Sequence, residues 1–234
     1  MLRQRVITAL ILAAVGLSAL FLLPAAAFAA AAALLLAGAG GWEAARLAGL
    51  DANGQRVALA AVLLALCLAL WLWLPSATVH WALLPACAIW LVNIAWLTRP
   101  ALGRSDRTAA IAGKLVVLAI ILAGAWLALA WLQSNSPWLV VMLLILIAAA
   151  DTFAYFTGRH FGGPKLAPRI SPGKTRTGAA GGLAGATALT AMSAFVLPDS
   201  PFTPAAGALV GLGLGMISII GDLFISLLTR QREL

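Results

Sequence analysis

Long apolar runs alternate with short polar segments along the whole chain. Runs of about 17–25 apolar residues have the length at which an α-helix crosses the hydrocarbon core of a bilayer. The pattern therefore predicts an all-α, polytopic membrane protein with about eight transmembrane helices. The expected spans are Val6–Leu23, Ala25–Ala45, Val57–Leu74, Trp81–Leu97, Lys114–Trp131, Pro137–Tyr155, Ala179–Leu197 and Phe202–Leu228.

The composition agrees with this interpretation. Of the 234 residues, 63% are hydrophobic and 9% are charged, whereas a soluble domain has about 25% charged residues. We expect a single integral-membrane domain over residues 1–234, with N-terminal helices in 1–135 and catalytic-type helices with a basic loop in 136–234. The first apolar run is longer than the core of a signal peptide, which favours an uncleaved first membrane helix.

The basic residues lie in alternate connections between the predicted helices. A formal charge of +8 could indicate nucleic acid binding in a soluble protein. In a membrane protein the positive-inside rule explains the charge without a nucleic acid partner, and it places both termini and every basic loop in the cytoplasm. The opposite connections lack Lys and Arg and are flanked by tryptophans, namely Trp71, Trp73, Trp81, Trp131 and Trp138.

Two carboxylates lie inside predicted helices that run in the same direction. Asp151 precedes Arg159 by eight residues, and Asp222 precedes Arg230 by the same number, so both acids lie about 12 Å inside a basic flank. Two carboxylates at one depth repel each other unless one stays protonated. A shared divalent cation with oxygen ligands would remove this conflict. The alternative is that each acid pairs with an arginine of a loop.

Residue spacing around the two acids supports a shared site. Tyr155 and Gly158 lie on the same helical face as Asp151. Around Asp222, polar residues recur at four-residue steps, which indicates a water-filled cavity or a hydrogen-bonded seam between helices. This polar stripe consists of Ser218, Asp222, Ser226 and Arg230.

Small residues mark the last two predicted helices. Glycines at this spacing let helix backbones approach each other closely, so we expect tight packing there. They are Gly178, Gly182 and Gly185 on the seventh helix and Gly207, Gly211 and Gly215 on the eighth.

A basic, glycine-containing loop joins the sixth and seventh predicted helices. In its Ser171–Thr175 segment, the Ser171 and Thr175 hydroxyls, the Lys174 ammonium and backbone N–H groups near Gly173 could bind phosphate oxygens. The segment is not a Walker A site, because Pro168 occupies a glycine position and no buried strand precedes it. Cation-binding acids beside phosphate-binding bases predict metal-assisted phosphoryl or nucleotidyl transfer at a membrane surface.

Five segments together resemble the bacterial phosphatidate cytidylyltransferase (CDP-diacylglycerol synthase) family. They are MLRQRVITAL at the start, WEAARLAG at Trp42–Gly49, DxxAYxxGRxFG at Asp151–Gly162, KLAPxISPxKT at Lys165–Thr175 and GDLFxSLL at Gly221–Leu228. The resemblance implies a Mg²⁺-dependent enzyme of the bacterial inner membrane with a cytoplasmic active face. Such an enzyme joins CTP to phosphatidate and releases CDP-diacylglycerol and pyrophosphate.

The resemblance and the residue chemistry together give a set of expected site residues. We expect Asp151 and Asp222 to hold the metal and to act in catalysis together with Lys174. The expected substrate-binding residues are Tyr155, Arg159, Lys165, Ser171, Thr175, Ser226 and Arg230.

The sequence departs from the family pattern at several places. The family usually has a lysine at the position of Gly173, an acid at Thr177, an acid at Ile225 and a lysine at Thr229. Its C-terminal signature, with a Lys-Asp pair, a His-Gly-Gly and an Asp-Arg-x-Asp, does not occur before Leu234. This predicts a truncated chain with little or no activity.

Three other functions stay open on the sequence alone. A CTP-dependent lipid-alcohol kinase would use similar groups. A cation-coupled transporter would place Asp151 and Asp222 on its ion path. A non-catalytic partner subunit would need no complete site, and a homodimer is also left open.

Overall fold

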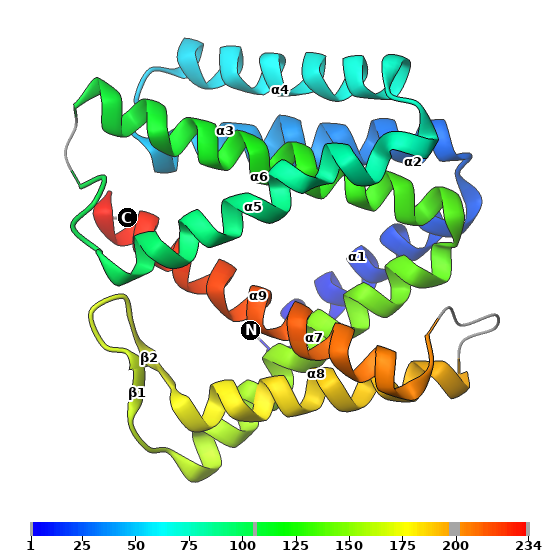
Figure 1. The fold of residues 1–234 in the computed structure, drawn as a ribbon, viewed down its shortest axis with the longest axis vertical. Coiled ribbons are helices and arrows are strands. Elements are labelled where there is room, and N and C mark those ends of the chain that lie inside the picture. The colour runs from blue at the N-terminus through cyan, green and yellow to red at the C-terminus, as the bar shows by residue number, and fades with distance from the viewer. Residues whose placement is uncertain (1, 105–106, 197–201, 233–234) are drawn as a thin grey trace.

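The computed structural model describes residues 2–104, 107–196 and 202–232, which form a helical protein with one small β-hairpin (Figure 1). A π-helical segment, η1 (Leu34–Ala39), joins α2 to α3 in one continuous rod. The helices are α1 (Leu2–Leu22), α2 (Ala25–Ala33), α3 (Gly40–Ala48), α4 (Asn53–Trp73), α5 (Val79–Thr98), α6 (Thr108–Asn135), α7 (Pro137–Phe161), α8 (Arg176–Val196) and α9 (Pro204–Gln231). A 3₁₀ turn, η2 (Ser76–Thr78), precedes α5, and the hairpin consists of β1 (Lys165–Ala167) and β2 (Ser171–Thr175).

Within the described residues every predicted span overlaps a helical segment, so the all-α membrane architecture is confirmed; Leu197, the predicted end of the seventh span, lies outside them. Seven helices in the described part of the chain are long and apolar enough to cross a membrane, and Ile7–Leu22 of α1 is a shorter apolar helix. The predicted count of eight spans therefore stays a prediction. Several helices extend beyond the predicted spans: α6 covers Thr108–Asn135, α7 continues to Phe161 and α8 begins at Arg176. The length of an apolar run reflects the thickness of the hydrocarbon core and does not mark the end of the helix. Helix α7 ends at Phe161, because the next residue, Gly162, has a positive φ of 61°, a conformation that glycine adopts readily.

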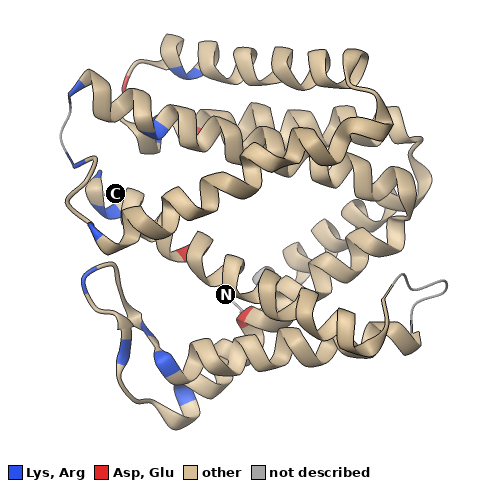
Figure 2. Ribbon diagram, viewed as in Figure 1, with Lys and Arg blue, Asp and Glu red and all other residues tan. Residues whose placement is uncertain are grey.

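The basic residues gather toward one end of the helices. Most blue segments lie toward the left of Figure 2, where the α3–α4 and α5–α6 connections, the hairpin and the end of α9 are found. The α1–α2, α4–α5 and α6–α7 connections lie at the opposite end. This separation is the one that the positive-inside rule requires, while the cytoplasmic location of the basic end stays a prediction.

Helices α2 to α6 pack through large side chains. Trp126 of α6 is buried and donates a hydrogen bond from Nε1 to the carbonyl oxygen of Ala29, at 2.8 Å. Phe28, Leu63 and Cys67 belong to the same buried cluster. A second buried cluster joins these helices to α9, where Phe224 and Leu228 pack against Ala44, Ala48 and Leu118.

Helices α7, α8 and α9 pack through glycines, as the sequence predicted. A Cβ atom added at Gly182 of α8 would lie 2.6 Å from the carbonyl oxygen of Ala150 on α7. One added at Gly211 of α9 would lie 2.7 Å from the carbonyl oxygen of Ala186 on α8. Helix α8 therefore lies in backbone contact with both of its neighbours.

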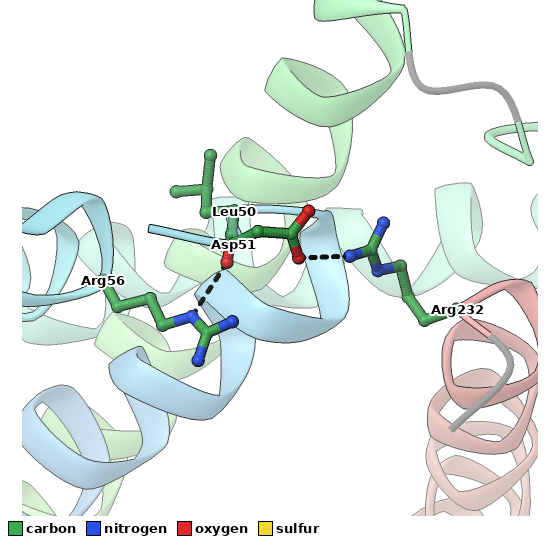
Figure 3. Close-up of polar contacts among 4 residues, drawn as sticks. All are labelled: Leu50, Asp51, Arg56 and Arg232. Atoms are coloured by element: carbon green, nitrogen blue, oxygen red, sulfur yellow. Dashed lines mark hydrogen bonds and ion pairs between the residues drawn. The ribbon is translucent and has the colours of Figure 1, made fainter. Parts of the chain in front are cut away.

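A polar clasp joins the end of α9 to the N-terminal helices. The Arg232 guanidinium lies 2.6 Å from the Asp51 carboxylate in the turn between α3 and α4, where Arg56 donates to the Leu50 carbonyl oxygen at 2.8 Å (Figure 3). Gln231 Nε2 also donates to carbonyl oxygens in the segment after α5, those of Pro100 at 3.0 Å and Leu102 at 2.8 Å. The clasp fixes the end of the helix that carries Asp222.

Candidate active site

A cavity of about 750 Å³ opens between α7, the β-hairpin, α8 and α9. Lys165, Gly173 and Lys174 of the hairpin line it, and the hairpin lies at the basic end of the helices (Figures 1 and 2). Seven of the ten residues expected from the sequence line it. They are Asp151, Tyr155, Arg159, Lys165, Lys174, Thr175 and Asp222.

The two acids reach the cavity from different helices, and a lysine from the hairpin joins them. Asp151 comes from α7 and Asp222 from α9, while the Lys174 ammonium on β2 forms an ion pair with the Asp222 carboxylate. Burial lowers the pKa of Lys174, and the negative charge of Asp151 acts in the opposite direction. The expected alternative, an acid paired with a loop arginine, is replaced at Asp222 by a pairing with this lysine.

The polar groups of α7 lie on one face, as the spacing predicted. Arg159 donates from Nη1 to the Tyr155 hydroxyl at 2.8 Å, and its guanidinium lies 6.0 Å from the centre of the same ring. Both side chains line the cavity one and two turns beyond Asp151. The tyrosine therefore orients a cationic fork that is suited to phosphate oxygens.

The predicted loop is in fact a short antiparallel hairpin. Lys165 lies opposite Thr175 in its register. At its base, the N–H of Arg176 donates to the carbonyl oxygen of Pro164 at 2.9 Å, and the Thr177 hydroxyl donates to the carbonyl oxygen of Gly162. These bonds tie the start of α8 to the end of α7 and hold the hairpin beside the cavity.

Thr175 has a structural partner as well as a place in the cavity. Its Oγ1 accepts a hydrogen bond from the N–H of Gly178 at 3.1 Å, the arrangement by which a threonine caps the first turn of a helix. Its hydroxyl is therefore less available to a phosphate than the sequence suggested. Lys174 and the exposed Gly173 backbone beside it carry the phosphate-binding capacity of β2.

Three expected substrate-binding residues lie outside the main cavity. Ser171, Ser226 and Arg230 line a second hollow of about 500 Å³. The polar stripe of α9 is thus divided, with Ser218 and Asp222 on the main cavity. The division follows from helix geometry. At 3.6 residues per turn, each four-residue step rotates the side chain by about 40° around the helix axis, so the later residues of the stripe point away from the direction of Ser218.

Sequence reasoning missed the small residues that make room for the cavity. Gly158 and Gly163 line it, as do Gly178 and Gly182 from α8. The glycine spacing on α8 signalled close packing, and the same residues also leave the cavity wall without side chains. His160, which lies next to Arg159 in the sequence, is not among the residues that line the cavity. Its ring contacts the Phe161 ring, with centroids 4.7 Å apart.

The donor set suits a divalent cation that is bound partly by substrate. Within the described residues, no group of three or more His, Cys, Asp or Glu side chains could hold a metal. Asp151 and Asp222 supply two carboxylates, and Asp222 already holds a cationic partner. Mg²⁺ is commonly bound through one or two carboxylates together with waters and substrate phosphates, so the residues fit this ion.

Comparisons with known proteins agree on one family. A sequence model described as the cytidylyltransferase family matches residues 3–234. A phosphatidate cytidylyltransferase of Pseudomonas aeruginosa is 37% identical over 235 residues, which cover 99% of this chain and 84% of that protein. An enzyme of the same name from Brucella abortus is 41% identical over 110 residues, which cover 45% of this chain and 39% of that protein. One from Chlamydia pneumoniae is 35% identical over 101 residues, which cover 42% of this chain and 33% of that protein.

No solved structure matches the chain. The sequence matches give no support to the expected truncation and inactivity, to the lipid-alcohol kinase, to the transporter or to the partner subunit.

Proposed function

The chain belongs to the cytidylyltransferase family, and on this premise we propose that it condenses CTP with phosphatidate to give CDP-diacylglycerol and pyrophosphate. The observation that carries the proposal is the cavity in which Asp151 and Asp222 meet Lys174, Lys165 and Arg159. Two carboxylates and three cations are the groups that a reaction between a triphosphate and a phosphomonoester needs. The proposed location is the inner membrane of a bacterium, with the cavity on the cytoplasmic side.

The reaction needs little help from a general base. A phosphate oxygen of phosphatidate, already an anion, attacks the α-phosphorus of CTP. The bond from that phosphorus to the bridging oxygen of the β-phosphate breaks, and pyrophosphate leaves with the electron pair. The main barrier is the approach of two anions, which positioned positive charge lowers.

The cavity side chains divide the work between cation and phosphate binding. Lys174, Lys165 and Arg159 would neutralise the triphosphate, and Tyr155 holds Arg159 in place. Asp151 and Asp222 would hold a divalent cation, for which we propose Mg²⁺. Such an ion supplies charge neutralisation and orientation at the transferred phosphoryl group.

The surroundings of the cavity suit one substrate from water and one from lipid. The hairpin is basic and lies at the same end of the helices as the other basic connections (Figure 2). CTP, which is an anion dissolved in water, would arrive from that end. Phe156 and Phe161 of α7, which lie next to Tyr155 and Gly162 in the sequence, are exposed apolar side chains, and the acyl chains of phosphatidate would lie against such a surface. Ser171, Ser226 and Arg230 would contact lipid headgroups in the second hollow.

The test is incorporation of label from CTP into lipid by the purified protein in phosphatidate-containing micelles. CTP labelled at the α-phosphorus should give a chloroform-soluble product, whereas CTP labelled at the γ-phosphorus should give none. The reverse pattern would identify a lipid kinase and reject the proposal. Absence of label from both nucleotides would also reject it.

A further inference from the structure

The ion pair between Lys174 and Asp222 places a protein cation on a carboxylate that the proposed function assigns to the metal. Lys174 reaches Asp222 from β2, and Asp151 on α7 also attracts its ammonium. All three side chains line the main cavity. The Asp222 side chain is 56% exposed and the Lys174 side chain 31%, so ions in the cavity can reach the carboxylate.

An ammonium and a divalent metal cannot both keep close contact with one carboxylate at little cost. The two cations repel each other, and the divalent ion carries twice the charge and bonds more strongly to oxygen. If the metal takes Asp222, the half-buried ammonium loses its partner. It then needs another anion within reach, because burying an unpaired charge is unfavourable.

The hairpin lets the lysine change partners without moving the backbone. The base of the hairpin is tied by hydrogen bonds from Arg176 to Pro164 and from Thr177 to Gly162. A Cβ atom added at Gly173 would meet nothing within 4 Å, so there is open space next to Lys174. The flexible side chain of lysine can swing through that space while β2 stays in place.

We propose that Lys174 and a divalent cation are alternative partners of Asp222, and that binding of metal with nucleotide transfers the Lys174 ammonium from Asp222 to the nucleotide phosphates. The inference rests on the proposed function, because it takes CTP as the nucleotide. It gives Lys174 opposite effects on two binding steps: it weakens binding of the metal alone and strengthens binding of the metal with CTP. The two ligands are then positively coupled through one side chain.

Binding of Mn²⁺ to the detergent-solubilised protein, measured by electron paramagnetic resonance without nucleotide, tests the competition. Lys174→Met removes the ammonium and keeps the length of the side chain. Lys165→Met removes the same charge from the same cavity and serves as the matched control. We expect Lys174→Met to bind Mn²⁺ about fivefold more tightly than the Lys165→Met protein, which corresponds to about 1 kcal/mol, the upper value for a partly exposed ion pair.

The second measurement repeats the Mn²⁺ titration with saturating CTP. CTP should tighten Mn²⁺ binding most in the wild type and least in Lys174→Met, and Lys165→Met, which loses one triphosphate contact but keeps the Lys174 ammonium, should lie between them. Lys174→Arg keeps a cation at this position and should retain weak Mn²⁺ binding without CTP. Asp222→Asn should weaken Mn²⁺ binding whether or not Lys174 is present.

Specific results would overturn the inference. Lys174→Met that binds Mn²⁺ no more tightly than Lys165→Met would show that the ammonium does not compete with the metal. Unchanged Mn²⁺ affinity in Asp222→Asn would show that Asp222 is not a ligand. If the Mn²⁺ competition holds but CTP labels no lipid, the proposed function fails and the competition at Asp222 stands.

Discussion

The N-terminal helices α2 to α6 and the C-terminal helices α7 to α9 differ in how they pack. The first group surrounds buried bulky side chains such as Trp126 and Leu63. A cavity of about 290 Å³ there is lined by alanine, leucine, cysteine and tryptophan side chains. The second group packs backbone to backbone, and its cavity is larger and lined by charged groups.

The difference shows how an apolar chain can build a polar site. Large apolar side chains surround the smaller cavity and offer no polar partner to water or phosphate. Glycines bring α8 against α7 and α9, so the helix ends stay fixed while the wall between Asp151 and Asp222 carries few side chains. The C-terminal helices therefore carry the two acids of the candidate site, and α9 is joined to the N-terminal helices by the buried cluster around Phe224 and by the clasp of Asp51 and Arg232.

The largest expected effect is loss of a cavity carboxylate. Asp151→Asn and Asp222→Asn should each lower turnover about a hundredfold or more, because the amide binds a divalent cation weakly. Folding should change little, since the two side chains have nearly the same shape. Label incorporation from CTP measures the turnover. Asp51→Asn, the same change in the clasp, should stay within about fivefold of the wild type, since a partly exposed ion pair contributes at most about 1 kcal/mol. Near-normal turnover of both cavity variants would place the site elsewhere.

Glycine substitutions should separate the two packing modes. Gly211→Leu should destabilise the protein by about 3 kcal/mol or more, because the new side chain meets the Ala186 carbonyl oxygen and Thr190. Gly213→Leu on the same helix is the control, because a Cβ atom there would meet nothing within 4 Å. Thermal unfolding in detergent gives the comparison. Equal melting temperatures for the two variants would contradict backbone packing of α8 on α9.

A smaller difference is expected between two cations of the cavity. Lys174→Ala should reduce CTP-dependent turnover more than Arg159→Ala, because Lys174 pairs with Asp222 and feels the charge of Asp151, whereas Arg159 bonds to the Tyr155 hydroxyl. Rates over a CTP titration at two salt concentrations test this. An equal, salt-sensitive loss in both variants would mean that the basic groups act only as a diffuse electrostatic patch.

The smallest expected effect concerns the clasp. Asp51→Arg should lower stability by about 0.5–1 kcal/mol, because the new guanidinium repels Arg232 at a partly exposed site. The double variant Asp51→Arg with Arg232→Asp should restore most of the loss, as measured by thermal unfolding. Additive losses in the double variant would show that this ion pair does not join the two groups of helices.

Much of this architecture could be predicted from the sequence because its signals are local. Apolar runs gave the helices, and glycine spacing gave the close contacts of α8. The spacing of Asp151 and Tyr155 placed both on one face of α7, and both line the cavity. Each of these inferences depends on residues within a few turns of one helix.

The remaining features depend on contacts between distant segments. The hairpin was missed because its strands have three and five residues, and Pro172 and Gly173 interrupt any alternating pattern. The pairing of Lys174 with Asp222 depends on how β2 lies against α9, which no local pattern specifies. The four-residue spacing predicts a single polar face on α9. In the structure the helix rotation turns Ser226 away from the main cavity and toward the second hollow.

Nucleotide protection of a cysteine in the cavity tests the central claim most directly. Ser218→Cys lies on the main cavity and Ser226→Cys on the second hollow, and each is made in a chain with Cys67→Ala and Cys87→Ser. The rate of maleimide labelling is measured with and without CTP and Mg²⁺. We expect CTP to slow labelling of Ser218→Cys severalfold and to leave Ser226→Cys nearly unchanged. Unchanged labelling of Ser218→Cys in saturating CTP would contradict the claim that the nucleotide binds between α7, the hairpin, α8 and α9.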